Sequence, residues 1–433
     1  MKRNIKINKG LDIHLKGSAF NLHHKVAPSL NYTVYPTDYP GLIPEVVVKD
    51  GDKIQAGTTL LYDKNAPSLK VVSPVSGTVL LVDRCEQRVL KDILIEADGK
   101  ESFIDFGKKD VNELSGKTIK TTLAAAGILA LFRQRPYDRI VNPEETPRDI
   151  FVSGFYSAPL HPDFDYVLKG QETDFQTGLD ALAKLTDGKV YLGVRSQQQT
   201  DNIQNAEVME FEGPHPAGNV GVQINHICPV NKGEVVWTVR PEDVLVIGRF
   251  FNKGSVDMTR LVALCGSEVN QSALGYYTLR LGQTVEPIVE NSVTQNIPLR
   301  FISGNPLTGK RISASGSLRV GDPQITVIPE GDECFDFLGW ARLVPAKVVD
   351  ARVKGSRRAM ILSEEWDKVF PMDILPDFLI RAIVANDVKK MEELGIYEVA
   401  PEDFALCEFV DTSKMELQQI VRQGLDTLYK EMI

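Results

Sequence analysis

The chain has 433 residues, 43% of them hydrophobic and 25% charged, which is the profile of a soluble globular protein with several domains. The 49 Lys and Arg against 58 Asp and Glu leave a net charge of −9, which disfavours nucleic acid as a partner because binding to phosphates draws on clustered cations. The longest apolar run, 123–132, is much shorter than the roughly 20 residues of a membrane-spanning helix. We therefore expect a cytoplasmic protein without a transmembrane segment, which leaves docking on a membrane complex open.

The first hundred residues are rich in short strands and turns. Residues 46–60 and 73–79 carry the patterns V-K-x-G-D-x-I-x-x-G-x-x-L and P-x-S-G-x-V, in which Gly marks tight turns between apolar runs. Together these patterns resemble the biotinyl/lipoyl-type barrel-sandwich hybrid, which we expect over 1–108. The basic N-terminus (Lys2, Arg3) is interpreted as a solvated strand edge.

Carrier domains of this type attach biotin or lipoate to a lysine in a hairpin. The Met-Lys-Met of biotin carriers is absent, and Lys64 after Asp63 is the only match to a lipoyl Asp-Lys. The next strand begins later than in lipoyl domains. Lys64 is therefore expected to be a solvated loop lysine.

From 109 the pattern changes to alternating helices and strands, which is typical of a parallel α/β sheet. Ala and Leu dominate 119–135 and predict a helix there, and Pro241 and Gly254 bound another helix. Between them lie a helix ended by Gly188 and predicted strands at 149–154, 190–194 and 235–239. We expect a Rossmann-like α/β domain over 109–256.

The remaining chain divides into a strand-rich and a helical part. Short strands with Gly, Asn and Pro turns predict a β-rich module over 257–330, and a mainly helical domain is expected over 331–433. There Asp387 caps a segment that ends at Gly395. Ser413 and Glu416 form a capping box before an amphipathic helix with Leu417, Ile420, Val421, Leu425 and Leu428 on its apolar face.

Few residues suggest chemistry. The five cysteines include no C-x-x-C, which argues against a disulfide framework, a zinc site and a conventional iron–sulfur motif, so buried free thiols are expected at Cys85, Cys228, Cys265, Cys334 and Cys407. His215, between two prolines, either contacts a partner or belongs to a turn that the prolines fix. His23–His24 lacks further ligands at metal spacing and is interpreted as a surface feature. No P-loop, G-x-G-x-x-G or arrangement for nucleophilic catalysis is found.

This order of modules resembles one family across its full length: the NqrA family, the A subunits of sodium-pumping NADH:quinone reductases, in which the β-rich module is an SLBB-like β-grasp. The matching local sequences are 9–12 (K-G-L-D), 214–218 (P-H-P-A-G), 302–304 (I-S-G) and 371–376 (P-M-D-I-L-P).

The resemblance implies a peripheral subunit on the cytoplasmic side of the bacterial inner membrane. In that complex of six subunits, electrons pass from NADH through FAD, iron–sulfur centres, FMN and riboflavin to a quinone while Na⁺ crosses the membrane. All these cofactors belong to the other five subunits, and this chain would dock chiefly on the membrane flavoprotein subunit. Quinone binding has been associated with the NqrA family.

The family itself looks like a degenerate relative of electron-input subunits that bind NADH, FMN and a [4Fe–4S] cluster. Their glycine-rich loop corresponds to 126–136, where Leu131 and Phe132 would obstruct a phosphate and the loop is expected to be a helix interior. Their four cluster cysteines correspond to Pro401, Phe404, Cys407 and Asp411, so Cys407 is expected to be a buried vestige.

We therefore expect a scaffold subunit with no catalytic, cofactor-binding or metal-binding residue of its own. Two alternatives stay open. One is an Rnf-type electron-input subunit with NADH, FMN and [4Fe–4S], which the missing cysteines and the obstructed loop disfavour. The other is a biotin or lipoyl carrier protein.

Overall fold

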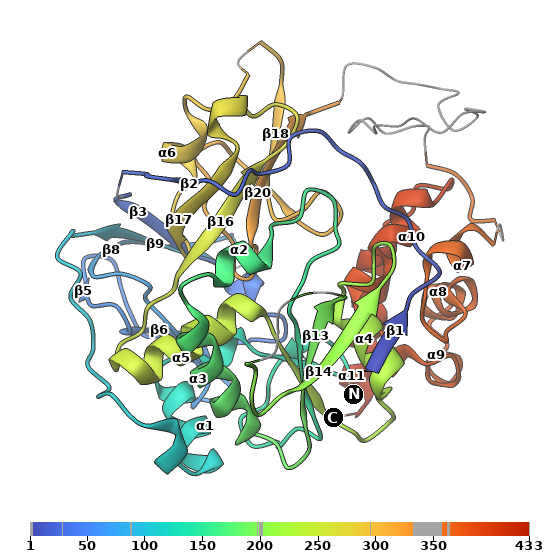
Figure 1. Ribbon diagram of the computed structural model, residues 1–433, viewed down its shortest axis with the longest axis horizontal. Coiled ribbons are helices and arrows are strands. Elements are labelled where there is room, and N and C mark those ends of the chain that lie inside the picture. Colours follow the sequence, from blue (N-terminus) through green and yellow to red (C-terminus); the bar gives the residue numbers. More distant parts are fainter. Residues whose placement is uncertain are drawn as a thin grey trace.

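The computed structural model describes residues 3–27, 29–86, 89–196, 198, 202–294, 296–331, 357–361 and 364–432. In this part of the chain, four sheets pack together and the C-terminal helices lie at one side of them (Figure 1). Cys334 and the first part of the expected helical domain lie outside the described residues.

Two small sheets form the barrel-sandwich hybrid that the turn pattern predicts. One has the strand order β3-β9-β8-β5 and the other β4-β6-β7. Their bounds are β3 Asn31–Val34, β4 Pro44–Val46, β5 Lys53–Ile54, β6 Thr59–Asp63, β7 Lys70–Val72, β8 Gly77–Arg84 and β9 Leu90–Ala97. A short 3-10 helix, η1 (Pro36–Asp38), follows β3 and leads toward the other modules.

A seven-stranded sheet with the order β1-β14-β13-β12-β15-β10-β11 forms the α/β module. The first five strands in this order are parallel, and β10 is antiparallel to both of its neighbours. The strands are β1 Arg3–Lys6, β10 Arg133–Arg135, β11 Arg139–Ile140, β12 Ile150–Ser153, β13 Val190–Arg195, β14 Glu207–Glu212 and β15 Val236–Val239. The basic N-terminus is thus an edge strand, as expected, but of this sheet.

Helices cover both faces of the sheet. In β12, Ile150 and Val152 point to the face covered by α3 (Glu172–Ala183) and α5 (Pro241–Lys253), which lie side by side to the left of β13 and β14 in Figure 1. Phe151 points to the opposite face and packs in a small cluster with Ile224 of α4 (Val220–Ile227). This alternation follows from the two-residue period of a strand. The short α2 (Phe164–Leu168) follows β12.

The helix predicted over 119–135 is shorter than expected. α1 spans Gly116–Ala125, and Gly127 then turns the chain at φ +71° into a 3-10 helix, η3 (Leu129–Leu131), and β10. The prediction of a helix interior at 126–136 was wrong because glycine in the left-handed region ends a helix even inside an apolar run. A further 3-10 helix, η2 (Val111–Glu113), precedes α1.

The β-rich module is a six-stranded sheet with the order β19-β18-β20-β16-β17-β2. Its strands are β2 His23–His24, β16 Thr259–Cys265, β17 Gly275–Arg280, β18 Leu299–Ser303, β19 Lys310–Ile312 and β20 Gln324–Pro329, with η4 (Gln271–Ala273) and α6 (Glu286–Val289) between strands. The histidine pair therefore forms an edge strand: His23 is exposed, and His24 stacks on Tyr277 with ring centroids 5.0 Å apart.

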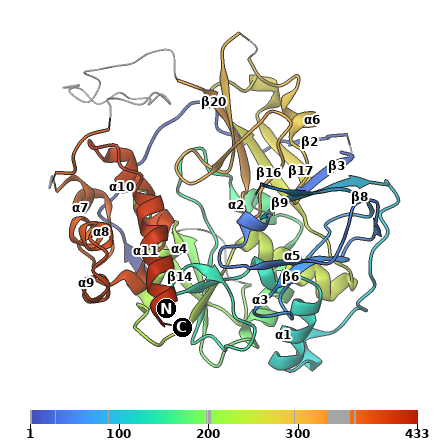
Figure 2. The ribbon, with the colours of Figure 1, turned by 180° about the vertical axis from the view of Figure 1, so that it is seen from behind.

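The C-terminal part is helical, as predicted. Its helices lie on the side of the molecule away from β5 and β8, as Figure 2 shows from behind. They are α7 Glu365–Val369, α8 Pro376–Val384, α9 Val388–Glu393, η6 Ile396–Glu398, η7 Pro401–Phe404, α10 Ala405–Val410 and α11 Leu417–Met432. Asp387 caps α9 by accepting a hydrogen bond from the Lys390 amide, as expected.

The start of α11 differs from the predicted capping box. The Ser413 hydroxyl donates to the Ala359 carbonyl at 3.3 Å, and the carboxylate of Glu408 in α10 accepts the Gln418 amide at 2.9 Å. A distant carboxylate thus replaces the local cap, and the helix begins later. The apolar face is confirmed for Leu417, Val421, Leu425 and Leu428, which are fully buried, whereas Ile420 is half-buried.

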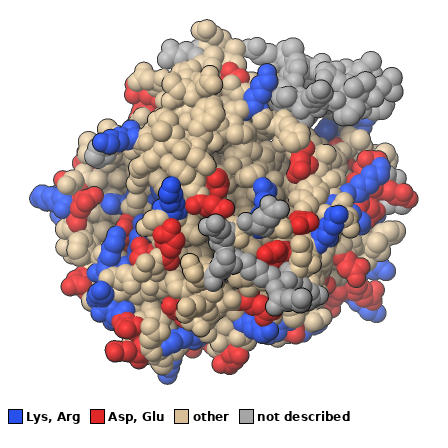
Figure 3. Space-filling model, viewed as in Figure 1, with Lys and Arg blue, Asp and Glu red and all other residues tan. Residues whose placement is uncertain are grey.

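Two large apolar cores hold these modules together. The first runs continuously through the barrel-sandwich hybrid, the α/β sheet and the β-rich sheet, and the second joins the C-terminal helices to β14 through Met209 and Phe211. Cations and carboxylates are interspersed on the face shown in Figure 3, which bears no extended cationic patch. Among the described residues, no helix combines the length and apolar character that a membrane crossing requires.

Candidate functional site

A cleft of about 390 Å³ lies where the modules meet. It opens at the carboxyl ends of β12 and β15, which are neighbours in the sheet although the chain visits β13 and β14 between them. Such a reversal of strand order is where open α/β sheets bind ligands. Its lining comes from η1 (Asp38), the loop after β12 (Tyr156, Ser157), the start of α5 (Arg240), the loop before β20 (Asp322) and η7 (Glu402).

In nucleotide-binding sheets, helix N-termini at this position hold phosphates. Here the first turn of α5 carries two buried carboxylates of its own, Glu242 and Asp243. Glu242 accepts a 2.5 Å hydrogen bond from the Tyr156 hydroxyl, and Asp243 forms a 2.9 Å ion pair with Arg260. Protein carboxylates thus already occupy the positive end of this helix dipole.

A carboxylate from the C-terminal helices occupies the N-terminus of α4. No side chain caps it and its first turn carries no acid, but a Cβ on Gly221 would lie 2.4 Å from a carboxylate oxygen of Asp403 in η7. Asp403 is buried and forms a 3.2 Å ion pair with Arg135 of β10, and Glu402 pairs with the same guanidinium at 3.2 Å. Burial raises the pKa of the Asp403 carboxyl, and the Arg135 charge opposes this rise.

The counterpart of the glycine-rich loop is packed with the protein's own side chains. Leu131 and Phe132 are buried, and Phe132 meets Trp237 edge to face at 5.8 Å. Gly127 approaches another side chain closely, since a Cβ there would lie 2.6 Å from a methyl carbon of Val72 in β7. Leu131 and Phe132 therefore pack inside the protein, in a turn and not in the expected helix interior, and their obstruction of a phosphate stays a prediction.

His215 lies on the wall of the cleft. Its Nδ1 is 3.0 Å from the Ser157 hydroxyl, which also accepts the Gly218 amide at 2.8 Å, and its backbone amide donates to Asp12 at 2.9 Å. Burial lowers the pKa of His215 to about 4, so the imidazole is neutral near pH 7. These contacts agree with the interpretation that His215 belongs to a turn within the protein. Contact of His215 with a partner stays a prediction.

Of the four residues expected to correspond to cluster cysteines, Pro401 and Phe404 lie in η7, Cys407 in α10 and Asp411 directly after α10. Cys407 is fully buried, as expected of a vestige, and burial raises the pKa of its thiol. Cys265 is buried too, whereas Cys85 is exposed and Cys228 half-buried, so the expectation of buried thiols was wrong for Cys85, whose hairpin turns it outward. Within the described ranges, no group of three or more His, Cys, Asp or Glu is arranged to hold a metal ion.

Lys64 lies exposed in the turn after β6. Asp63 accepts the amides of Asn65 at 2.7 Å and Ile43 at 3.4 Å, which fixes that turn. The interpretation of Lys64 as a solvated loop lysine is confirmed.

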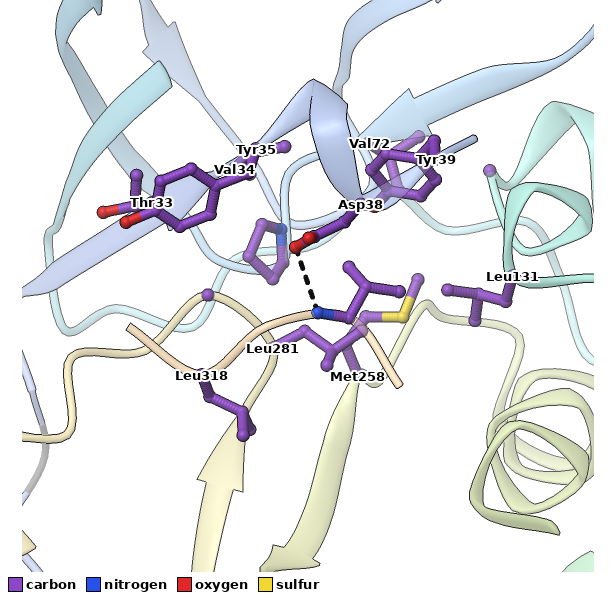
Figure 4. A pocket seen from close by; sticks show the side chains of 14 residues that line it. Thr33, Val34, Tyr35, Asp38, Tyr39, Val72, Leu131, Met258, Leu281 and Leu318 are labelled. Atoms are coloured by element: carbon purple, nitrogen blue, oxygen red, sulfur yellow. Dashed lines mark hydrogen bonds between the residues drawn. The ribbon is translucent and has the colours of Figure 1, made fainter. Parts of the chain in front are cut away.

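A second, much smaller cavity of about 20 Å³ separates η1 from the β-rich module. Figure 4 shows the Asp38 carboxylate reaching across it to a backbone amide, that of Val320, at 3.2 Å. Arg319 and Lys310 also bind this carboxylate, at 2.7 and 2.8 Å. This cavity has room for roughly one water molecule. The cleft of about 390 Å³ is the candidate site because it lies at the carboxyl ends of β12 and β15.

Sequence reasoning assigned no site residue, and the structure gathers Arg133, Arg240, Asp322 and Glu402 around the cleft. One available signal was the position of Arg240, directly after the strand predicted at 235–239. Polar residues at the carboxyl end of a parallel strand commonly face a ligand. The side chains from η1, β18–β20 and η7 carried no such signal, because they reach the cleft through contacts between modules.

The barrel-sandwich hybrid, the parallel sheet with its strand-order reversal and the β-rich module define a multidomain α/β protein. Three family descriptions match it: "NqrA N-terminal barrel-sandwich hybrid domain" over 5–98, "NqrA second alpha/beta domain" over 114–256 and "NQRA C-terminal domain" over 261–314.

Relatives match over the full length. The chain is 34% identical to the A subunit of the Na(+)-translocating NADH-quinone reductase of Hahella chejuensis, covering 99% of this chain and 100% of that one, and 32% identical to that of Rhodopirellula baltica, covering 98% of each. It belongs to the NqrA family, the A subunits of Na(+)-translocating NADH-quinone reductases. A crystal structure of NAD+-reducing [NiFe]-hydrogenase in the H2-reduced state aligns with 74% of this chain and 64% of its own, at 11% identity and a TM-score of 0.40, too low to carry an argument.

Proposed function

We propose that this chain is the peripheral A subunit of a Na⁺-translocating NADH–quinone reductase and works on the cytoplasmic side of the bacterial inner membrane. The observation that carries the proposal is the match to NqrA proteins over 98 to 100% of both chains. A match of that extent includes all four modules and not a single shared domain. The whole complex would couple NADH oxidation and quinone reduction to Na⁺ export.

Within this complex, the chain holds other subunits in place and carries no electrons. The buried turn at Leu131 and Phe132 supports this role, because a phosphate needs free backbone amides where these side chains pack. The carboxylates of Asp243 and Asp403 support it further, because they occupy the N-termini of α5 and α4, where a nucleotide phosphate would otherwise bind. One cysteine at the four cluster positions is too few ligands for iron.

The partners are the five other subunits, chiefly the membrane flavoprotein subunit. FAD, FMN, riboflavin and the iron–sulfur centres are assigned to those subunits, and quinone reacts near this chain without a cofactor in it. Apolar side chains on and beside α8 are exposed and can pack against these subunits, among them Leu375, Phe378 and Val384.

Affinity purification through a tag on this chain tests the assignment. The expected result is co-purification of five companion subunits together with NADH:quinone reductase activity that Na⁺ stimulates. A matched preparation with the tag on an unrelated soluble protein controls for membrane carry-over. Recovery of this chain alone under conditions that keep the complex intact, or with an intact mass increased by biotin or lipoate, would contradict the proposal.

A further inference from the structure

Six cationic side chains line the cleft between the modules: Arg133, Arg135, Arg240, Lys310, Arg319 and Arg422. Some of them form ion pairs with carboxylates and others do not. Arg135 pairs with Asp403 and Glu402, Lys310 and Arg319 pair with Asp38, and Arg422 pairs with Asp426. Among the described residues, Arg133 and Arg240 have no carboxylate within ion-pair distance.

The sheet places these two guanidinium groups on the same side. Arg133 in β10 lies opposite Thr238 in β15, and Arg240 follows Thr238 by two residues, so both side chains leave the same face at diagonal positions. The pKa of Arg133 is lowered to about 10, first by burial and then by the charge of Arg240. Burial acts to lower the pKa of Arg240, but the charges of Asp243 and Asp322 raise it, although neither carboxylate lies within ion-pair distance. An anion between Arg133 and Arg240 would offset the repulsion between their like charges.

Contacts with the backbone hold each guanidinium group in place, and each group keeps N–H donors without a hydrogen-bond partner in the described part of the chain. Arg133 donates through Nη2 to the Asp38 carbonyl at 2.5 Å, while its Nη1 has no hydrogen-bond partner. The Arg240 guanidinium lies against the backbone of Gly321, because a Cβ there would be 1.2 Å from Nη1. Gly321 has a φ of +84°, so both its conformation and this contact require glycine.

We propose that this cleft binds a small dianion whose anionic oxygens are bound by Arg133 and Arg240 together. Planar guanidinium forks match the oxygen geometry of phosphate and carboxylate groups, and both chemistries satisfy the site. The enclosure of the cleft by η1, the α/β sheet, the loop before β20 and η7 favours a small molecule over a protein segment. This inference does not depend on the proposed place of the chain in a respiratory complex.

Asp322 opposes the anion and provides a second test. Its carboxylate lines the same cleft and interacts with the charge of Arg240. Removing its charge by Asp322→Asn therefore removes a repulsion from the ligand while keeping a side chain of the same shape. We expect Asp322→Asn to bind the anion more tightly than the natural protein at pH 7.5.

Isothermal titration calorimetry of the purified full chain in 150 mM NaCl (a chosen buffer, about physiological ionic strength) tests the proposal with three probes: sulfate, inorganic phosphate and succinate. The expected result is saturable binding of at least one probe, with Arg240→Gln and Arg133→Gln weakening it roughly 10- to 100-fold. A preference for phosphate and sulfate over succinate would identify a phosphoryl-type ligand, and the reverse a dicarboxylate; either supports the proposal.

Arg300→Gln is the matched control, because Arg300 pairs with Glu330 in the β-rich sheet and does not line the cleft. Its affinity should equal that of the natural protein. The proposal is overturned if no probe binds saturably, or if Arg240→Gln and Arg300→Gln bind equally well. Should both cleft arginine variants fail to fold by circular dichroism, Asp322→Asn decides: tighter binding supports the site, and unchanged or weaker binding overturns it.

Discussion

Arg135 connects two modules that are far apart in sequence. Its side chain starts in β10 of the α/β sheet and pairs with Asp403 and Glu402 of η7. Arg135 and Asp403 are buried, whereas the side chain of Glu402 is 42% exposed. A buried ion pair of this kind contributes little net stability, but losing one partner leaves an uncompensated charge. The pair therefore acts mainly by fixing how the C-terminal helices sit on the sheet.

We predict that Arg135→Met destabilises the protein by about 3–5 kcal/mol, because Asp403 keeps its buried charge without a counterion. Adding Asp403→Asn should recover much of this loss, since the amide oxygen can still accept the Ala400 amide that Asp403 now accepts at 2.8 Å. Urea unfolding of both single variants and the double variant measures the coupling. Strictly additive effects would show that the pair is not coupled in solution.

His215 should make stability depend on pH. Its folded pKa of about 4 lies below its ordinary value of 6.5, so the unfolded chain binds a proton that the folded chain refuses. The associated stability is fully present above pH 6.5 and is lost as the pH falls toward 4, by about 3 kcal/mol at most. His215→Gln should show a shallower fall of unfolding free energy between pH 7 and 4.5 than the natural protein; equal slopes would refute this assignment.

Gly127 ends α1 and lets the following turn pack on the barrel-sandwich hybrid. We predict that Gly127→Ala destabilises the protein by more than the roughly 1–2 kcal/mol cost of a left-handed alanine, because its Cβ would collide with Val72. Gly107→Ala is the control, since Gly107 has a similar φ of +73° and open space around it. Thermal unfolding of both variants should separate the backbone strain from the collision with Val72. Equal losses of stability in the two variants would mean that Val72 moves aside without measurable cost.

At the scale of single elements, α11 holds the C-terminal group through one apolar stripe. Leu425→Asp should cost more than about 3 kcal/mol and impair assembly, because it buries a charge among fully buried side chains. Gln423→Asp places the same charge on the exposed side of the same helix and should cost little. If Leu425→Asp leaves both stability and co-purification intact, the packing of this helix is not as described.

Elements with strong local signals could be predicted from the sequence. α5 is an example: Pro241 starts it, Gly254 ends it in the left-handed conformation, and its apolar period lies between them. α1 was extended too far because composition outweighed the single glycine that ends it. The start of α11 was misplaced because its cap, Glu408, comes from another helix. Contacts over long sequence separations leave no periodic signature.

The candidate site was less accessible to sequence reasoning. The sequence shows that Cys407 is the one cysteine among positions 401, 404, 407 and 411, and it shows the bulky side chains of Leu131 and Phe132. The filling of α4's N-terminus by Asp403 is not visible there, because it requires η7 to fold back onto the α/β sheet. Likewise, β1 joins that sheet at β14 from more than 200 residues away in sequence, as the pairing of Arg3 with Met209 shows.

At the scale of the whole molecule, the protein's own carboxylates occupy the N-termini of α4 and α5 beside the cleft. One apolar core runs through three modules and a second attaches the C-terminal helices, so packing contacts restrain the modules relative to one another. Restraint of this kind suits a docking role, because little conformational freedom is lost on assembly.

The most direct test of this account is the flavin and iron content of the full chain, purified alone after expression with flavin and iron supplied. Absorbance between 350 and 500 nm (a range chosen for flavin and iron–sulfur bands) and elemental analysis should show neither flavin nor iron in stoichiometric amount. The reasons are the packed side chains in the turn at Leu131 and Phe132 and the presence of one cysteine where a cluster needs four. One flavin or one cluster per chain would contradict the account.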